Sequence, residues 1–335
     1  MHSSAHGDDG HPGSDGSAAP VRGRVRRAGW QRVSRGLYRR TLDLPALSEE
    51  LRSWQLVLPA SGAFTHLSSA QARGWWLPPL PADLPVFAAV HDADGRPRRD
   101  GLLVCRHTQV IDADDDNGIR LATGAETLLA AARDLGLLDL VVLADAALHL
   151  GDCTLDDLHP TANRRRRGAP ALRRALGYVD GRSESAWESM LRMLHVACDV
   201  PVEPQREVVN SDGEFVARAD LWIPGTRRVH EYDGDEHRER KRHGTDLRRE
   251  RALQRAGYAR YGYTSSVLLR QAVTVLRDAD DALGRPHEPD RICVWHRLLA
   301  ESLFTAAGTA RLRARWGLPP MECGETGRQR HPRGA

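Results

Sequence analysis

The chain has 335 residues, of which 41% are hydrophobic and 28% are charged, with a formal net charge of +3 at pH 7. No stretch approaches the roughly 18 consecutive apolar residues of a membrane helix, and the first twenty residues lack the apolar segment of a secretion signal. The five cysteines form no C-x-x-C pair, so neither a zinc ribbon nor a disulfide framework is indicated. We expect a two-domain protein of the reducing cytoplasm, with no membrane partner.

The N-terminal half predicts a mixed α/β domain over residues 29–158, after a Gly/Ser/Asp-rich segment, 1–28, that we expect to be disordered. Residues 55–64, 84–92 and 101–107 are strand-like, and 67–75 is typical of a short helix. A helical pattern over 122–151 begins at Thr123 and ends at Gly151. Residues 159–182, with four consecutive arginines, predict a basic linker or a short helix.

The C-terminal half has a more regular pattern over residues 183–284. An amphipathic helix with a serine cap spans 183–198. Three strands joined by tight turns follow in 205–234, the first turn containing Asp-Gly and the second Pro-Gly. A helix over 245–257, a strand over 258–263 and a helix over 265–283 complete the half. The order of helix, three antiparallel strands, helix, strand and helix predicts an α/β core. Residues 285–335 predict one helix and a disordered tail.

The second hairpin of this half, "RADLWIPGTRRVHEYDGDEH", carries acidic residues within its strands. With the turn at Gly225-Thr226, residues whose numbers sum to 451 face each other, so Asp220 opposes Glu231 with Cβ atoms roughly 4.5–5.5 Å apart. Asp233 lies on the same face as Glu231 because side chains alternate along a strand.

Like charges directly opposite each other destabilise a sheet, so this arrangement favours a cation between the carboxylates. Mg²⁺ binds few carboxylate oxygens and can activate a bound water. Glu188 lies at the edge of the apolar stripe of the first helix and is expected to point beside the sheet. The alternative is a solvated strand face with three independent acids.

At these residues the chain resembles the PD-(D/E)XK nuclease superfamily, and more closely its very-short-patch-repair (Vsr)-like domains of unknown function. The resemblance covers residues 183–284, with a restriction-endonuclease-like core. It is carried by Ser185-x-x-Glu188, by "RADLWIP" with Asp220, by "HEYDGDEH" with Glu231, Asp233, Gly234 and His237, and by "DLRRERALQRAGY" with Asp246, Arg249, Leu253 and Gly257.

The resemblance implies that Asp220 and Glu231 bind Mg²⁺ or Mn²⁺ and that Glu188 assists. Asp233 occupies the position of the superfamily's lysine, and the single lysine, Lys241, lies downstream of it. The resemblance therefore leaves Asp233 or His237 as general base or charge stabiliser, and His237 is preferred because imidazole titrates near neutral pH. A second departure is Gly262, where relatives usually have arginine.

The N-terminal half is similar, more weakly, to the antitoxin of type IV abortive-infection (AbiE) systems. "VSRGLYRR" matches the end of a winged-helix module, and "THLSSAQARGWWLP", "GLLVCRH" and the helical pattern after Ala122 follow in the family's order. A complete winged helix does not precede "RGLYRR", so DNA reading by a recognition helix is not expected.

Basic residues follow the acidic cluster directly, and cations beside a metal site would neutralise the phosphates of DNA. The alternative is a solvated helix of an arginine-rich chain, with local Glu–Arg pairs. The residues expected to contact DNA are Arg238, Arg240, Lys241, Arg242, Arg248 and Arg249.

The sequence thus predicts a metal-dependent DNA endonuclease or nickase, a phosphodiester hydrolase serving DNA repair or phage defence, with no small-molecule cofactor. The alternative is a catalytically inactive DNA- or protein-binding protein of an antitoxin-like system that uses the nuclease fold as a scaffold.

Overall fold

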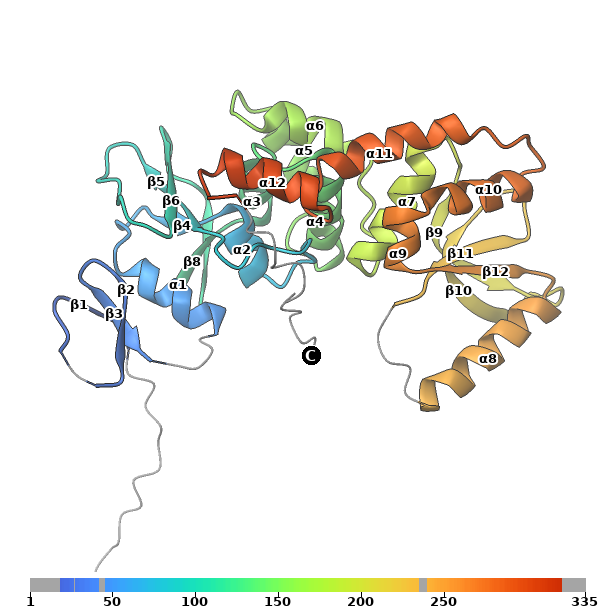
Figure 1. Ribbon diagram of the computed structural model, residues 1–335, viewed down its shortest axis with the longest axis horizontal. Helices are drawn as coiled ribbons and strands as arrows, with labels where there is room; N and C mark the ends of the chain where they lie inside the picture. Colours follow the sequence, from blue (N-terminus) through green and yellow to red (C-terminus); the bar gives the residue numbers. More distant parts are fainter. Residues whose placement is uncertain (1–18, 27, 42–45, 235–239, 321–335) are drawn as a thin grey trace, which may run out of the picture.

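The computed structural model of the protein describes residues 19–26, 28–41, 46–234 and 240–320, with the backbone alone for 240–247 (Figure 1). It is a mixed α/β structure with sheets of three, five and four strands, which confirms the predicted α/β class. No helix of the described residues is long and apolar enough to cross a membrane.

The smallest sheet has the order β1-β3-β2, with β1 (Val21–Arg22), β2 (Trp30–Ser34) and β3 (Leu37–Arg40) all antiparallel. Its Leu37 is fully buried in a cluster with Leu51 and Trp54 of α1 (Leu47–Gln55). Because β1 pairs with β3, residues 21 and 22 belong to the fold, although 1–28 was expected to be disordered. Residues 1–18 and 27 lie outside the described residues.

The five-stranded sheet has the order β6-β5-β4-β8-β7. Its strands are β4 (Ala63–Phe64), β5 (Val86–His91), β6 (Leu102–His107), β7 (Ala113–Asp116) and β8 (Ile119–Ala122). The strands predicted over 84–92 and 101–107 and the short helix, α2 (His66–Ala72), are confirmed. The strand predicted over 55–64 is wrong except at its last two residues. Leu51 and Trp54 recur at helical spacing, and α1 buries them through Gln55, followed by turns.

Four helices continue the N-terminal half: α3 (Gly124–Ala131), α4 (Leu137–His149), α5 (Leu155–Ala162) and α6 (Ala169–Leu176). The long helical pattern is thus two helices, the first of which starts after Thr123 as predicted. The basic segment 159–182 contains the end of α5 and all of α6, whose Leu172 is fully buried. Arg164 and Arg166 pair with Glu126, which is 3% exposed. A buried carboxylate needs such partners, so this segment is folded against the core.

The C-terminal sheet has the order β12-β11-β10-β9, with β11 and β12 parallel and the other pairs antiparallel. Its strands are β9 (Glu203–Val209), β10 (Phe215–Trp222), β11 (Arg228–Tyr232) and β12 (Ala259–Tyr263). Figure 1 shows α7 (Ala186–Ala197), α9 (Ser265–Arg270) and α10 (Ala272–Ala282) on one face and α8 (Arg240–Arg255) on the other. The predicted order of helix, three antiparallel strands, helix and strand is observed, with the second helix ending before Gly257, which has a φ of +80°. The single helix predicted over 265–283 is instead the two helices α9 and α10.

Two further helices follow, where the sequence predicted one: α11 (Ile292–Ala300), after a 3-10 turn (Pro289–Arg291), and α12 (Ala306–Arg315). The second helix returns to the N-terminal half, where Arg313 pairs with Asp83 and Arg315 with Asp134. The ring of Trp316 lies 5.4 Å from that of Phe87. Residues 321–335, expected to be a disordered tail, lie outside the described residues.

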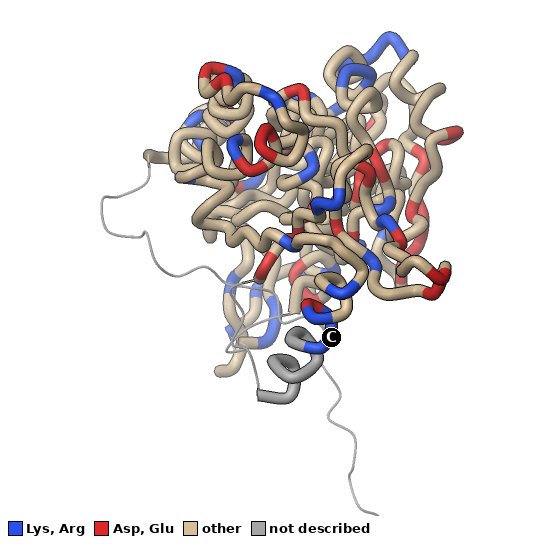
Figure 2. The backbone as a smooth tube through the Cα atoms, turned by 90° about the vertical axis from the view of Figure 1, so that its right-hand side faces the viewer, with Lys and Arg blue, Asp and Glu red and all other residues tan. Residues whose placement is uncertain are grey.

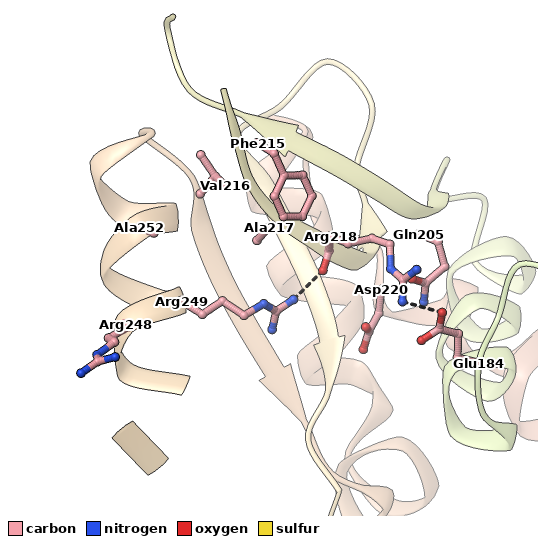
Figure 3. A pocket seen from close by; sticks show the side chains of 10 residues that line it. All are labelled: Glu184, Gln205, Phe215, Val216, Ala217, Arg218, Asp220, Arg248, Arg249 and Ala252. Carbon is pink, nitrogen blue, oxygen red and sulfur yellow. Dashed lines mark hydrogen bonds and ion pairs between the residues drawn. The ribbon is translucent and has the colours of Figure 1, made fainter. Parts of the chain in front are cut away.

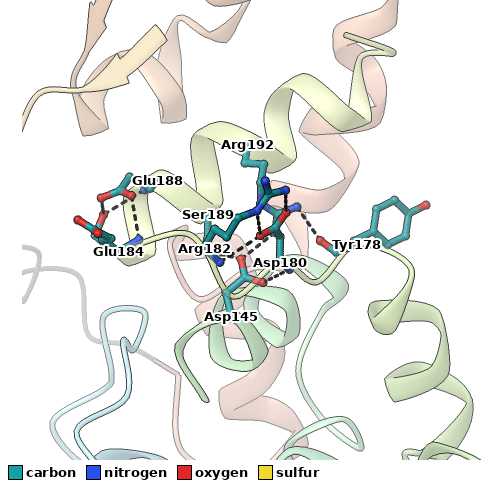
Figure 4. Close-up of polar contacts among 9 residues, drawn as sticks. Asp145, Tyr178, Asp180, Arg182, Glu184, Glu188, Ser189 and Arg192 are labelled. Atoms are coloured by element: carbon teal, nitrogen blue, oxygen red, sulfur yellow. Dashed lines mark hydrogen bonds and ion pairs between the residues drawn. The ribbon is translucent and has the colours of Figure 1, made fainter. Parts of the chain in front are cut away.

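One hydrophobic cluster extends across both halves and includes Leu143 of α4, Leu191 of α7 and Trp295 of α11. Within the same contact, Arg192 of α7 pairs with Asp145 of α4 at 2.7 Å, and Ser189 donates to the same carboxylate at 2.6 Å (Figure 4). Both members of the pair are buried, with side chains 6% and 0% exposed. The halves that the sequence predicted as domains are therefore joined by an apolar core with an ion pair inside it.

We predict that Asp145→Ala lowers the free energy of unfolding by about 3–5 kcal/mol, because it leaves the Arg192 guanidinium buried and unpaired. Arg182→Ala is the matched control: it breaks the exposed Arg182–Asp180 pair, whose loss should change stability by less than about 1 kcal/mol. Denaturant unfolding measures both values. Equal effects of the two substitutions would contradict the structural role given to the Asp145–Arg192 pair.

Candidate functional site

The hairpin of β10 and β11 has the predicted register. Leu221 pairs with His230 and Trp222 with Val229, and in both pairs the numbers sum to 451. The ladder continues to the turn, where the N–H of Ile223 donates to the carbonyl of Arg228. Asp220 and Glu231 are the next residues beyond Leu221 and His230, so this register brings the two acids opposite each other.

Asp220 has a hydrogen-bond donor and no ion-pair partner among the described residues. One of its oxygens accepts a hydrogen bond from the Tyr232 N–H at 2.9 Å, and no ion pair to it occurs among the described residues. Burial raises its pKa to about 7, and the negative charges of Glu188 and Glu231 act in the same direction. Asp220 is therefore an acid that holds its proton close to neutral pH.

Glu231 is the buried member of the pair, only 2% exposed, and it is neutralised by arginines. Arg249 of α8 donates to both of its oxygens, at 2.7 and 2.6 Å, and Arg260 of β12 forms a further ion pair with it. Arg249 also donates to the Arg218 carbonyl at 2.6 Å. Arg249, which the sequence assigned to DNA contact, thus binds a carboxylate and a strand of the protein itself.

Asp233 follows β11, and its carboxylate forms an ion pair with Arg260. Since Arg260 reaches both Glu231 and Asp233, the two acids lie on the same side of the sheet, as predicted. A Cβ at Gly262 would overlap the Asp233 carboxylate. A larger residue at position 262 would require the Asp233 side chain to move, and here Arg260, two residues earlier in the strand, supplies the guanidinium.

Glu188 lies in the first turn of α7 and takes part in capping that helix. Its N–H donates to the side chain of Ser185, and its carboxylate accepts from the Ser185 hydroxyl at 2.9 Å and from the Glu184 N–H at 2.8 Å. Burial is the main cause that raises the pKa of Glu188. Gln205 of β9 donates to the same carboxylate at 2.9 Å, so the helix cap and the sheet meet at this acid.

Gln205 is a site residue that the sequence analysis missed. It has a φ of +54°, in the left-handed region that side chains other than glycine rarely adopt, at a cost of roughly 1–3 kcal/mol. Such a conformation has no signature in the sequence. Gln205 lies next to Asp220 in the sheet, because the residues on either side of Gln205 pair with Ala219 and Leu221 of β10.

Of the residues described above, Asp220, Gln205 and Arg249 border a cleft of about 590 Å³ between β9, β10 and α8 (Figure 3). Figure 3 shows Asp220, Gln205 and Glu184 along one wall and Arg248 and Arg249 on the opposite wall, with an Arg218–Glu184 ion pair between the strand and the start of α7. The remaining lining is formed by Phe215, Val216, Ala217 and Ala252. Phe215 is 63% exposed, so the cleft combines both signs of charge with an apolar rim.

The other predicted site residues are only partly described. His237 and Arg238 lie outside the described residues, and Arg240, Lys241 and Arg242 lie in α8 where the backbone alone is described. Arg248 is exposed at the cleft. Seen from the end of the molecule that carries this sheet, basic and acidic positions are interspersed over the described chain (Figure 2).

The described residues contain no group of three or more His, Cys, Asp or Glu side chains placed to hold a metal ion. Asp220 and Glu231 provide carboxylate oxygens, the ligand type that Mg²⁺ prefers. The two guanidinium groups on Glu231, however, already neutralise that acid. The carboxylate oxygens are suitable ligands for a divalent cation. While Arg249 is paired with Glu231, Asp220 is the member of the two acids that is available to bind the ion.

Comparisons with known proteins give two relatives. No family model matches the chain, and no solved structure matches it. The uncharacterized proteins MT2308 and Rv2248, from Mycobacterium tuberculosis strains CDC 1551 and H37Rv, are each 32% identical to it over 120 residues. The match covers 35% of this chain and 44% of each relative, so the chain spans less than half the length of these proteins.

The raised pKa of Asp220 predicts a pH-dependent cost of folding. Because the folded carboxyl titrates near 7 and its ordinary value is 3.8, the cost is absent below about pH 4, grows as the pH rises, and is complete above about pH 7. We predict that Asp220→Asn stabilises the protein by on the order of 2 kcal/mol at pH 8 and by much less at pH 5.

Asp212→Asn, at an exposed position in the turn between β9 and β10, is the matched control and should show no such dependence on pH. Urea unfolding at the two pH values makes the comparison. A gain for Asp220→Asn that is equal at pH 5 and pH 8 would show that the carboxyl carries no such cost.

Proposed function

We propose that the C-terminal half is a restriction-endonuclease-like domain that hydrolyses phosphodiester bonds of DNA with a divalent metal ion, as an endonuclease or nickase. The observation that carries the proposal is Asp220, a half-buried acid with a raised pKa beside Glu188 and Glu231, at a cleft whose other wall is basic. Strongly perturbed acids in clefts are typical of functional sites.

The element order of the C-terminal half supports this proposal. Helix α7, the antiparallel strands β9 to β11, helix α8, and strand β12 parallel to β11 follow the order expected of the nuclease superfamily that the sequence resembles. Fold alone does not define an activity. The weight therefore rests on the acids that this order brings to one side of the sheet.

The cleft has acidic residues on one wall and arginines on the other, and this distribution supports the binding of a metal cation together with a nucleic acid. Asp220 and Glu188 carry no paired cation among the described ion pairs, and Mg²⁺ or Mn²⁺ held by Asp220 and Glu231 would provide one. Bound there, the ion would supply activation of a water for attack on phosphorus. Arg248 and Arg249 on the facing helix would neutralise the phosphates, Arg249 only after leaving Glu231.

A second candidate function is a catalytically inactive DNA- or protein-binding domain that keeps the nuclease fold as a scaffold. This candidate is favoured because Glu231 forms ion pairs with Arg249 and Arg260, and Asp233 forms an ion pair with Arg260. Asp233 is thereby held in an ion pair, which makes it a poor general base. A role in DNA repair or in an antitoxin-like defence system is part of the proposal for either candidate.

We predict that the purified protein converts supercoiled plasmid to nicked or linear DNA in Mg²⁺ or Mn²⁺. Asp220→Asn and Glu231→Gln should each lower the rate at least about 100-fold, since each removes a charge that would act on the transition state. Glu207→Gln, at an exposed acid of the neighbouring strand β9, is the control and should cleave normally. Cleavage by both site variants at the parent rate would refute the site, and salt-sensitive DNA binding without cleavage in either metal would favour the second candidate.

A further prediction separates the two candidates by metal affinity. If a cation competes with Arg249 for Glu231, Arg249→Met should raise the affinity for Mn²⁺ by about tenfold or more, because it removes a positive charge in direct contact with the carboxylate. Arg248→Met, next to it and exposed, is the matched control and should leave the affinity unchanged. Calorimetric titration of Mn²⁺ measures both, and equal affinities of the two variants would exclude Glu231 as a ligand.

A further inference from the structure

The N-terminal end of the molecule contains an unbalanced run of positive charge. Between Gly16 and Leu42 the sequence has no acidic residue and eight arginines, namely Arg22, Arg24, Arg26, Arg27, Arg32, Arg35, Arg39 and Arg40. Four of these arginines, Arg22, Arg32, Arg39 and Arg40, lie in the strands of the small sheet β1-β3-β2. Many arginines elsewhere in the described chain form ion pairs with carboxylates, for example Arg73, Arg164 and Arg313.

A cleft of about 500 Å³ lies where this sheet meets the loop between β5 and β6, and we call it the arginine cleft. It is lined by Arg35, Val57, Gly95, Arg96, Pro97, Arg98 and Arg99. Arg99 donates to the main-chain carbonyl of Arg35, which ties the loop to the β2–β3 turn. Arg35, Arg96 and Arg98 are exposed. Two segments some sixty residues apart in sequence thus bring four guanidinium groups to one opening.

None of these four arginines forms an ion pair with a carboxylate anywhere in the described residues. The acids nearest in sequence have other neighbours or face solvent: the Asp94 carboxylate accepts from the Ser61 hydroxyl, and Asp92 lies 3.6 Å from a ring nitrogen of His91. Asp100 is exposed. Four cations that share an opening repel one another, so the arrangement is stabilised when an anion with several charges binds.

We propose that the arginine cleft binds the sugar-phosphate backbone of duplex DNA, independently of base sequence. A guanidinium donates to phosphate oxygens through two parallel N–H groups, and a row of such contacts supplies sequence-independent affinity. The lining contains no aromatic ring, whereas single-stranded nucleic acid is bound by stacking bases on aromatic side chains. Contacts to phosphate alone therefore favour the duplex.

This surface lies at the opposite end of the molecule from the sheet β9–β12 (Figure 1). It does not rest on the phosphodiester chemistry proposed for the C-terminal cleft, because phosphate contacts position DNA whether or not a bond is cleaved. The full chain would therefore hold DNA at a site remote from Asp220.

The test is binding of a short fluorescent DNA duplex to the full-length protein, measured by anisotropy in EDTA over a range of salt concentrations. EDTA removes divalent metal, so cleavage neither contributes nor is required. The triple variant Arg35→Gln/Arg96→Gln/Arg98→Gln should bind at least about tenfold more weakly and lower the slope of log affinity against log salt by about 2–3. Arg99 is retained because it holds the β2–β3 turn.

The matched control removes the same charge from positions outside the arginine cleft, with Arg174→Gln/Arg270→Gln/Arg277→Gln at exposed arginines that have no ion pair in the described chain. It should bind like the parent, and thermal unfolding should show all three proteins folded. The proposal is overturned if the parent does not bind the duplex, if both triple variants lose affinity equally, or if the cleft variant keeps the parent's salt slope. Tighter binding of duplex RNA, or displacement of the DNA by an equally charged acidic polypeptide, would also overturn it.

Discussion

The central constraint of the C-terminal half is the placement of Asp220 and Glu231 opposite each other in one hairpin. The Pro-Gly turn fixes a register in which paired residues sum to 451, and that register leaves two acids side by side. Glu231 is buried and neutralised by Arg249 and Arg260, while Asp220 has a main-chain donor and no paired cation. The proposed chemistry depends on this asymmetry between two neighbouring carboxylates.

Arginine serves this protein in two distinct ways. Some guanidinium groups act as internal counter-ions: Arg192 neutralises Asp145 where the halves meet, and Arg260 joins Glu231 to Asp233 across parallel strands. Others, in the arginine cleft, have no carboxylate partner among the described residues. Composition does not separate these uses, because the separation depends on which carboxylates the fold brings within reach.

Local signals in the sequence were sufficient for much of the C-terminal fold. The serine cap at Ser185, the Pro-Gly turn and the helix end before Gly257 are short-range features, and they define the helix and strand order and the hairpin register. Contacts over long sequence distances were not predictable in the same way. The ion pairs of Arg260 depend on the parallel pairing of β11 with β12. The positive φ of Gln205 is a local strain, and the packing of α12 on the N-terminal half depends on the core between the halves.

The protonation state of Asp220 is the sharpest test of the proposed site. Its carboxyl carbon can be followed by NMR through a pH titration, without and with Mg²⁺, and assigned by comparison with Asp220→Asn. The proposed site predicts a midpoint near 7 without metal and a lower midpoint with Mg²⁺, because a bound cation favours the charged form. A midpoint near the ordinary value of 3.8, unchanged by Mg²⁺, would contradict it.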